Sequence, residues 1–252
     1  MRSTVDLNCD LAESYFDKKI GNDSGIIPLI SSCNIACGLH GGDPFTIQKA
    51  IDLALEHKVN IGAHPSFPDL ENFGRKEMHL SAEDLKACLR FQIGAVAQMT
   101  SLRGGVLRHI KPHGALYNMA AKDFELATQI VEVLKEFKLD LCLLGMANSQ
   151  MENAAKAQQV EFIAEVFADR NYTDSGKLLD RSFANAVIDD KDKVIKRCIK
   201  MIAENKILSE NNIQLALEAQ SICVHGDTFN AQRLVEAINM GFRENGILIQ
   251  SF

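Results

Sequence analysis

Short β-like runs alternate with segments of helical spacing along almost the whole chain, and this alternation restricts the possible folds more than any other feature. Strands that alternate with helices favour a parallel sheet covered by helices. Seven strands in 252 residues predict an α/β fold of the irregular (β/α) barrel type rather than an open doubly wound sheet. The predicted strands are residues 3–9, 32–37, 59–64, 107–111, 139–145, 161–167 and 221–225, with a short final strand over 246–252.

Apolar residues recur at helical spacing between most of these strands. Asp43 before Pro44 is predicted to cap one helix, and Ser81–Asp84 resembles a capping box that starts another. Residues 146–159 are a weaker, more polar helix. No Ser/Gly linker or charge run divides the chain, so we expect a single domain over residues 1–252. The helical faces are marked by Ile47, Ile51 and Ala54; Leu85, Leu89 and Val96; Leu126, Ile130 and Phe137; Ile195, Ile199 and Ile202; and Leu234, Ile238 and Phe242.

Composition excludes several classes of function. A net charge of −6 argues against nucleic-acid binding, which needs a basic surface. The N-terminal stretch lacks an apolar export signal, and no run of about 18 apolar residues occurs, so no membrane span is expected. The seven cysteines are odd in number and lie mostly in apolar stretches, which predicts reduced core thiols. We therefore expect a cytoplasmic protein.

Polar residues follow the predicted strands at their carboxyl ends, where parallel α/β folds place their active sites. Four of the seven histidines belong to this group, and a convergence of histidines, a lysine and several acids predicts a functional cleft. The fifth strand contributes nothing obvious, and His57, His79 and His109 are given no role. The group consists of Asn8, Asp10, Asn34, His40, His64, Lys111, His113, Glu165, Asp169, Arg170, His225 and Asp227.

Histidine and carboxylate together can bind a metal or transfer protons without one. No HExxH spacing occurs, and Lys111 among the histidines would repel a divalent ion, so no tightly bound metal is expected. A cation there would suit an oxyanion or a carboxylate instead. The chain has no Gly-x-Ser-x-Gly elbow and neither standard phosphate-binding glycine motif. ATP, if it is used, is therefore expected to be handled by another chain.

Six segments resemble the LamB/YcsF family, in the same order along nearly the whole chain. They are DLNCDL at 6–11, NIACGLHGGDP at 34–44, GAHPSFPD at 62–69, KPHGALYN at 111–118, EVFADRNY at 165–172 and CVHGD at 223–227. Two positions depart from the family pattern. Ala12 stands where glycine is usual, and residues 183–185 replace a segment that usually contains Pro-Gly; both are expected in loops outside the polar group.

The resemblance implies a function, because this family is known as the A subunit of 5-oxoprolinase. It implies ATP-dependent opening of the lactam of 5-oxoproline (pyroglutamate) to L-glutamate, together with partner subunits B and C. In the family picture, subunits B and C activate the lactam by phosphorylation with ATP as cosubstrate, and the A subunit completes the ring opening. The implied fold is a seven-stranded (β/α) barrel similar to that of polysaccharide deacetylases.

Four residues are candidates for the chemistry of that reaction. Asp10 or His64 is expected to orient or deprotonate the attacking water as a general base. Lys111, with His113, is expected to stabilise charge on the activated carbonyl oxygen or its phosphate.

The remaining polar residues are candidates for substrate binding. The glycine-flanked helix starts after His40 and His225 are expected to receive the substrate carboxylate or a phosphate through backbone N–H groups. Arg170 is a second candidate for the carboxylate, or it forms an ion pair with Asp169 or Glu165 instead. The predicted substrate-binding set is Asn8, Asn34, His40, Glu165, Arg170, His225 and Asp227.

Two other classes of function stay open. A metal-dependent deacetylase or amidohydrolase that acts alone would need a tightly held divalent ion and no ATP. A non-catalytic assembly subunit would bind substrate or position its partners, although a scaffold needs no cluster of ionisable groups.

Overall fold

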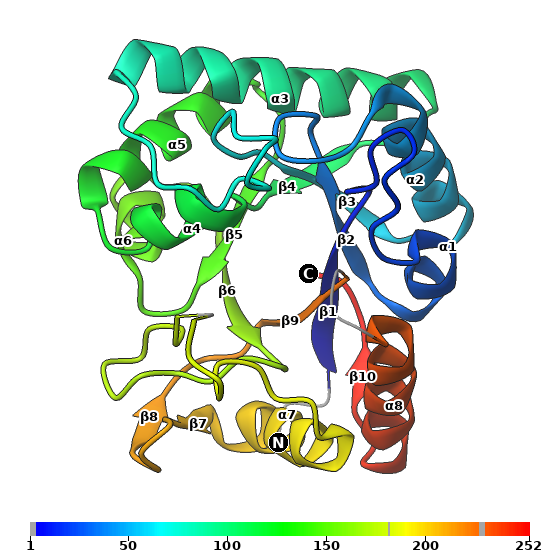
Figure 1. The fold of residues 1–252 in the computed structure, drawn as a ribbon, viewed down its shortest axis with the longest axis vertical. Coiled ribbons are helices and arrows are strands. Elements are labelled where there is room, and N and C mark those ends of the chain that lie inside the picture. The colour runs from blue at the N-terminus through cyan, green and yellow to red at the C-terminus, as the bar shows by residue number, and fades with distance from the viewer. Residues whose placement is uncertain (1–3, 181, 227–229) are drawn as a thin grey trace.

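Seven parallel strands form a closed barrel at the centre of the chain (Figure 1). The structure is a computed structural model that describes residues 4–180, 182–226 and 230–252. The strands follow one another in chain order, and the last pairs with the first, from Asp6 beside Ser221 to Asp10 beside His225. The predicted (β/α) barrel is confirmed. Its strands are β1 Thr4–Leu11, β2 Ser32–Ala36, β3 Asn60–His64, β4 Leu107–Ile110, β5 Cys142–Met146, β6 Phe162–Phe167 and β9 Ser221–His225.

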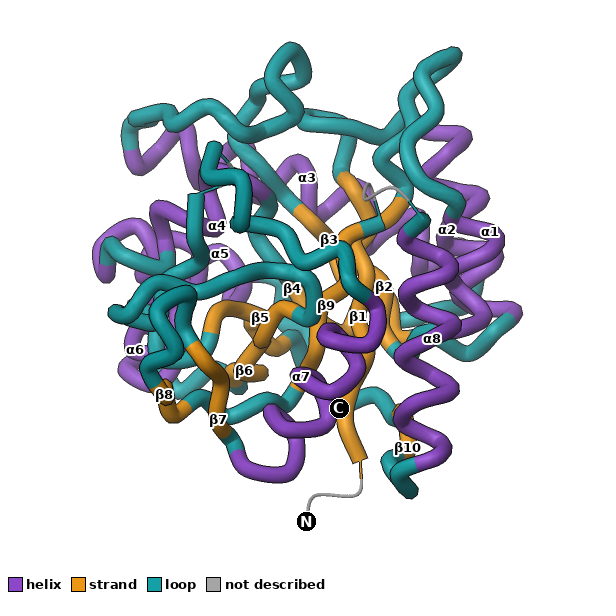
Figure 2. The backbone as a smooth tube through the Cα atoms, turned by 60° about the horizontal axis from the view of Figure 1, so that its bottom comes forward, coloured by secondary structure: helices purple, strands orange, loops and turns teal. Residues whose placement is uncertain are grey.

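Helices surround the barrel, and Figure 2 shows the strands enclosed by them. The Asp43 carboxylate accepts from the N–H groups of Phe45 and Thr46, and Ser81 Oγ accepts from Asp84 N, so both predicted caps are confirmed. The long helices are α2 Pro44–Glu56, α3 Ala82–Leu102, α5 Phe124–Glu136, α6 Gln150–Ala157, α7 Lys191–Glu204 and α8 Ala231–Glu244. The short ones are α1 Asp23–Ile26, the 3₁₀ turn η1 Ile27–Leu29 and α4 Gly114–Ala120.

Some boundaries differ from the prediction. β1 extends two residues beyond its predicted end, and Ser3, where the prediction began, lies outside the described residues. β5 begins only at Cys142, where its pairing with His109 of β4 starts, and Leu139 and Asp140 before it are exposed. The polar helix predicted from residue 146 begins only at Gln150, since 146 still belongs to the strand.

Among the described residues, three short strands occur besides those of the barrel. β10, Leu248–Ile249, pairs in parallel with the start of β1, which confirms the predicted final strand. β7, Lys206–Leu208, and β8, Gln214–Ala216, form an antiparallel hairpin that the sequence did not predict. Three residues are too few to show a strand period.

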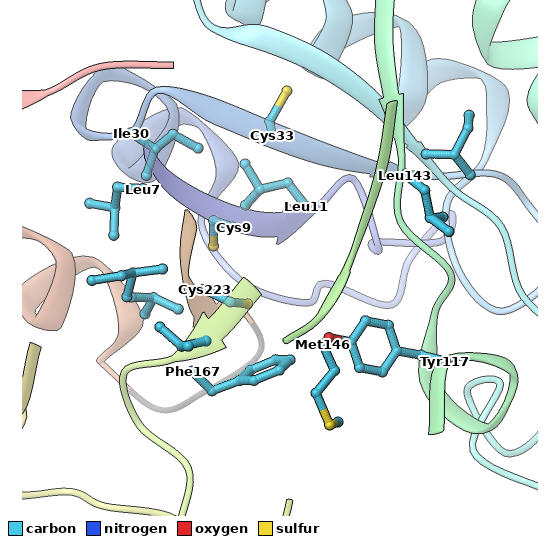
Figure 3. Close-up of a cluster of buried hydrophobic side chains, with 14 of the residues drawn as sticks. Leu7, Cys9, Leu11, Ile30, Cys33, Tyr117, Leu143, Met146, Phe167 and Cys223 are labelled. Carbon is cyan, nitrogen blue, oxygen red and sulfur yellow. The ribbon is translucent and has the colours of Figure 1, made fainter. Parts of the chain in front are cut away.

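The inside of the barrel is polar, and β1 shows why. Its side chains alternate: Leu7, Cys9 and Leu11 pack with apolar residues (Figure 3), whereas Asp6, Asn8 and Asp10 bond to polar residues of other strands.

Hydrogen bonds connect this polar interior along the barrel axis. Asp6 accepts from the hydroxyl groups of Ser31 and Ser32, at 2.6 Å each, and from Ser221. Asn8 Nδ2 donates to Ser221 Oγ at 2.7 Å. Asn34 Nδ2 donates to Asn8 Oδ1 and to Asp10 Oδ1, both at 2.8 Å. The network therefore runs from Asp6 to the carboxyl end of β1.

All seven cysteines carry free thiols, and every one except the half-buried Cys88 is buried, which confirms the predicted reduced core cysteines. Among the described residues, no helix combines the length and the apolar character that crossing a membrane requires.

The buried carboxyl group of Asp6 predicts a pH dependence of stability. Burial raises its pKa from 3.8 to about 6, more than the serine hydroxyls lower it. The folded chain therefore binds this proton more tightly than the unfolded chain, and stability is lost as the pH rises through this range. Between pH 4 and pH 7, the free energy of unfolding of Asp6→Asn should rise relative to that of the unmodified chain by about 2 kcal/mol.

Chemical denaturation at several pH values tests this expectation, with the exposed Asp140→Asn as control. The control should show no such pH-dependent difference. A difference between Asp6→Asn and the unmodified chain that stays constant with pH would contradict the assignment.

Candidate active site

A cavity of about 770 Å³ opens at the carboxyl ends of the barrel strands. Its walls come from segments 112–122 and 146–149, from the loop 170–183 that follows β6, and from the β7–β8 hairpin. Six of the predicted site residues line it: Asp10, His64, Lys111, His113, Arg170 and His225. Four others, Asn8, Asn34, His40 and Glu165, are buried and do not line the cavity, and Asp227 lies outside the described residues.

The Lys111 ammonium group is buried at the floor of the cavity, with 2% of the residue exposed. Its Nζ lies 2.8 Å from Asp10 Oδ1 and 2.8 Å from Glu165 Oε1. It also contacts Asn8 Oδ1 at 3.2 Å and Cys223 Sγ at 3.1 Å. Burial alone would lower the pKa of Lys111, but Asp10, Cys223 and Glu165 outweigh it and hold that pKa well above its usual value.

These contacts change the role expected for Lys111. An ammonium group has three N–H donors, and the contacts with Asp10, Glu165, Asn8 and Cys223 already occupy them. The predicted stabilisation of a substrate oxyanion needs a free donor, so these contacts do not favour it. Lys111 instead orients the carboxylate of Asp10 and keeps it ionised.

The predicted substrate contacts of Asn8, Asn34 and Glu165 are likewise not favoured, because these residues support the floor from below. Glu165 accepts a hydrogen bond from Tyr117 Oη at 2.8 Å and one from Asn8 Nδ2 at 3.0 Å. Tyr117 lines the cavity and was missed by the sequence analysis, although it lies in the KPHGALYN segment. Its ring lies beside Phe167, with centroids 5.9 Å apart, and Figure 3 shows both near Met146.

His109, which was given no role, belongs to the same support. Its Nε2 lies 2.7 Å from Asn34 Oδ1 in the barrel interior. Gly62 on the neighbouring strand makes room for the ring, since a Cβ at this position would overlap it. The glycine of the GAHP segment is thus required by packing.

Asp10 connects the lysine with the histidines. Its Oδ1 accepts from Lys111 and Asn34, and its Oδ2 lies 3.5 Å from His64 Nε2. Burial would raise the pKa of Asp10, but His64 and Lys111 hold it well below its usual value. Asp10 is therefore a carboxylate at neutral pH and a weak proton acceptor.

Three histidines and Glu13 form the histidine cluster, which consists of Glu13, His40, His64 and His113. The rings of His40 and His113 stack, with centroids 3.7 Å apart, and the edge of His64 faces both. Glu13 Oε1 lies 3.7 Å from His113 Nδ1 and 3.7 Å from His40 Nε2. The potential ligand atoms of these four residues all lie within 4.8 Å of one another, so the cluster has the composition of a metal site.

Glu13 was missed by the sequence analysis. Its signal was its place three residues after Asp10, just beyond the end of β1.

His225 and Asp169 form an acid–base pair at the cavity, where a ring nitrogen of His225 lies within 4.8 Å of a carboxylate oxygen of Asp10. His225 Nδ1 lies 3.1 Å from Asp169 Oδ1, and its ring stacks on Phe167 at 5.4 Å. Burial would raise the pKa of Asp169, but His225 outweighs it and lowers that pKa. The carboxylate therefore orients the imidazole, as in hydrolase triads.

Arg170 donates to backbone carbonyl groups. Its Nη2 lies 2.6 Å from Leu179 O and its Nε lies 3.3 Å from Ala186 O. The side chain thereby stabilises the loop that forms one wall of the cavity, and it still lines that cavity.

The predicted anion site at the helix start after His40 is not available. Pro44 has no N–H group, and Asp43 already accepts from the next two N–H groups of α2. The predicted anion site at the helix start after His225 stays a prediction, because residues 227–229 lie outside the described residues.

Two expectations about loops need correction. Met146, Ala147 and Ser149 line the cavity, so the fifth strand does contribute to the site through its carboxyl end. Phe183, in the segment that departs from the family pattern, also lines the cavity and is 57% exposed. Ala12, the other departure, has φ +60°, a backbone conformation that favours glycine.

Comparison with known proteins gives one consistent result. The LamB/YcsF family model matches residues 5–252. A protein of Bacillus cereus, named as the A subunit of 5-oxoprolinase, is 44% identical over 248 residues, 98% of each chain. The crystal structure of a lactam utilization protein from Thermus thermophilus covers 100% of both chains, with a TM-score of 0.93 and 38% identity. A family 4 carbohydrate esterase from Streptomyces lividans shares the fold, with a TM-score of 0.50 and 9% identity over 98% of this chain and 91% of that chain.

Lys111→Met tests the energetic weight of the buried ammonium group. The substitution leaves the carboxyl groups of Asp10 and Glu165 buried beside each other without a cation, which should cost about 3–5 kcal/mol of unfolding free energy at pH 7. Lys86→Met is the matched control, because its ion pair with Glu132 lies near the surface and should be worth less than about 1 kcal/mol. Both variants are unfolded with urea. Equal losses of unfolding free energy in the two would refute the role assigned to Lys111.

Proposed function

The chain belongs to the LamB/YcsF family, and on that premise we propose that it is the A subunit of an ATP-dependent 5-oxoprolinase, which opens the lactam of 5-oxoproline to L-glutamate. The observation that carries this proposal is the similarity to relatives of that name over 98% of both chains. The site supports it, since ionisable groups converge in one cavity of this chain.

Opening the lactam requires a water molecule at the carbonyl carbon and a proton for the ring nitrogen. The new bond joins the water oxygen to the carbonyl carbon, and the bond from that carbon to the ring nitrogen breaks. The freed nitrogen becomes the α-amino group of glutamate. The site must therefore hold an acceptor for the proton of water and a donor for the departing nitrogen.

The water is proposed to lie between Asp10 and His64. Asp10 Oδ2 and His64 Nε2 are 3.5 Å apart and both residues line the cavity. Because Asp10 has a strongly lowered pKa, its part is to orient the water and to stabilise positive charge on the imidazole.

His225 is proposed as the proton donor to the ring nitrogen. Asp169 orients its imidazole through Nδ1, and the residue is only partly buried at the cavity wall. Arg170 remains the proposed contact of the substrate carboxylate, since it lines the same cavity.

ATP is proposed to be used by, or together with, partner subunits B and C. The name of the Bacillus cereus relative describes one subunit of a larger enzyme, which implies a multi-subunit complex. A cavity of about 770 Å³ is of the size that holds a drug-sized ligand, so it has room for a phosphorylated lactam. We further propose a cytoplasmic location, since seven free thiols are typical of a reducing compartment.

Glutamate release from 5-oxoproline tests the function directly. It is measured with ATP for this chain alone, for subunits B and C alone, and for the three together. Release is expected only from the complete set. Release by subunits B and C without this chain would contradict the proposal, and hydrolysis of amides by this chain alone without ATP would indicate an independent hydrolase.

The pair of His225 and Asp169 is tested in the complete enzyme. Asp169→Asn removes the carboxylate that orients the ring, and kcat should fall by about 10²–10⁴-fold with little change in KM. The kcat of His225→Asn should fall by a similar factor. The kcat of the double variant should be no lower than that of either single variant, because the two residues act as one unit. His57→Asn, an exposed histidine at the end of α2, is the control. Additive losses, or an equal loss in the control, would reject this role.

A further inference from the structure

Two ring nitrogens of the histidine cluster face each other at hydrogen-bond distance. His64 Nε2 and His113 Nδ1 are 2.9 Å apart in a buried site. What occupies the space between them depends on which nitrogens carry hydrogen.

The other nitrogen of each ring determines the tautomer. His64 Nδ1 lies 2.7 Å from the carbonyl oxygen of Lys111, and His113 Nε2 lies 2.9 Å from the carbonyl oxygen of Phe73. A carbonyl oxygen only accepts, so both of these nitrogens carry hydrogen. In neutral rings the two facing nitrogens then both present lone pairs, which repel each other.

A cation removes this repulsion, and the surroundings favour a metal ion over a proton. Metal-binding histidines generally donate their second N–H to a backbone carbonyl or a carboxylate, and both rings do so here. Glu13 Oε1 lies 3.7 Å from His113 Nδ1. Ligand atoms that share a tetrahedral zinc ion lie about 3.4 Å apart, as follows from metal–ligand distances of about 2.1 Å. The two observed separations from His113 Nδ1, 2.9 Å to His64 Nε2 and 3.7 Å to Glu13 Oε1, lie on either side of that value.

His40 gives a second indication that the site takes a ligand. Within the described ranges, neither of its ring nitrogens has a hydrogen-bond partner, although the ring is buried. Its ring is stacked parallel to that of His113 at 3.7 Å, so an ion in the plane of His113 lies outside the plane of His40. His40 is therefore placed to contact Glu13 or a bound water rather than the ion.

The charge of Lys111 does not oppose a divalent ion, contrary to the expectation from sequence. Asp10 and Glu165 each lie 2.8 Å from its Nζ and compensate it. The ammonium charge is therefore paired with two buried carboxylates within the floor of the cavity.

We propose that His64 Nε2, His113 Nδ1 and the carboxylate of Glu13 bind one divalent transition-metal ion of the zinc class. Two imidazoles and a carboxylate are a ligand set of catalytic zinc sites, which keep a further position for water. Imidazole ligands favour zinc, cobalt, nickel or copper over magnesium or calcium.

The use of this ion in catalysis rests on the proposed function. A bound ion lowers the pKa of its water, which then adds to the lactam carbonyl carbon as hydroxide. Because His64 Nε2 would then be a ligand of the ion, Asp10, whose Oδ2 lies 3.5 Å from it, would orient the metal-bound water. The proton of that water would pass to solvent in the cavity, and the ring nitrogen would take its proton from His225. The ion would thereby generate the hydroxide nucleophile, which a carboxylate of low pKa does not generate.

Metal binding is measured on the full chain without any partner. The chain is treated with chelator, dialysed, and titrated with Zn²⁺ by calorimetry and with Co²⁺ by visible absorption. One ion per chain and the intense visible bands of low-coordinate Co²⁺ are expected. Glu13→Gln, which keeps the shape of the side chain, and His113→Ala should each weaken binding by more than about 100-fold. His57→Asn should bind as the unmodified chain does.

Two results would overturn the site. One is no binding of Zn²⁺ or Co²⁺ at micromolar concentrations by the unmodified chain, which would leave a shared proton between the two rings. The other is equal binding by the unmodified chain and by both cluster variants, with circular dichroism confirming that the variants are folded.

Catalytic use is tested in the complete enzyme. The chain is freed of transition metal before it is mixed with subunits B and C, ATP and excess Mg²⁺. Glutamate release should be lost and should return when one equivalent of Zn²⁺ is added. Full release without Zn²⁺ would overturn the catalytic use of the ion while the binding site stands. Metal binding without release under any condition would count against the proposed function instead.

Discussion

The buried ammonium group of Lys111 is the interaction on which the rest of the site depends. It joins residues of different strands, because Lys111 follows β4, whereas Asp10 belongs to β1 and Glu165 to β6. A charge in this position is tolerable only with both partners present. Together with His64 it holds the pKa of Asp10 well below its usual value, so the carboxylate at the cavity floor stays ionised.

A polar barrel interior is the structural condition for such a lysine. In many (β/α) barrels branched apolar side chains fill this space. Here Asn8 and Asn34 bond to each other and to the carboxyl groups around them, so these buried amides have partners within the barrel. Stability then comes from the apolar layer between strands and helices, where Leu7 and Leu11 lie, and the inside is free to serve the chemistry.

Much of the fold was predictable from the sequence, and much of the site was not. Strand and helix periods located the barrel, and the rule for parallel strands placed His64, Lys111 and His225 at one end of it. Periodicity says which face a side chain lies on, but not which atoms it meets. The same reasoning therefore grouped Asn34, which lies beneath the floor, with residues that line the cavity, and it missed Glu13, which only the closed barrel brings to the histidines.

The floor and the walls of the cavity come from different parts of the chain. The floor belongs to the barrel strands and is held by buried charges, whereas part of the walls comes from outside the barrel, from Phe183 in the loop after β6 and from the β7–β8 hairpin. Changes in these loops alter the shape and width of the cavity without touching the ionised groups beneath. On the proposed function, such changes would alter which ring sizes and ring substituents fit the cavity, while the ionised floor beneath would stay the same.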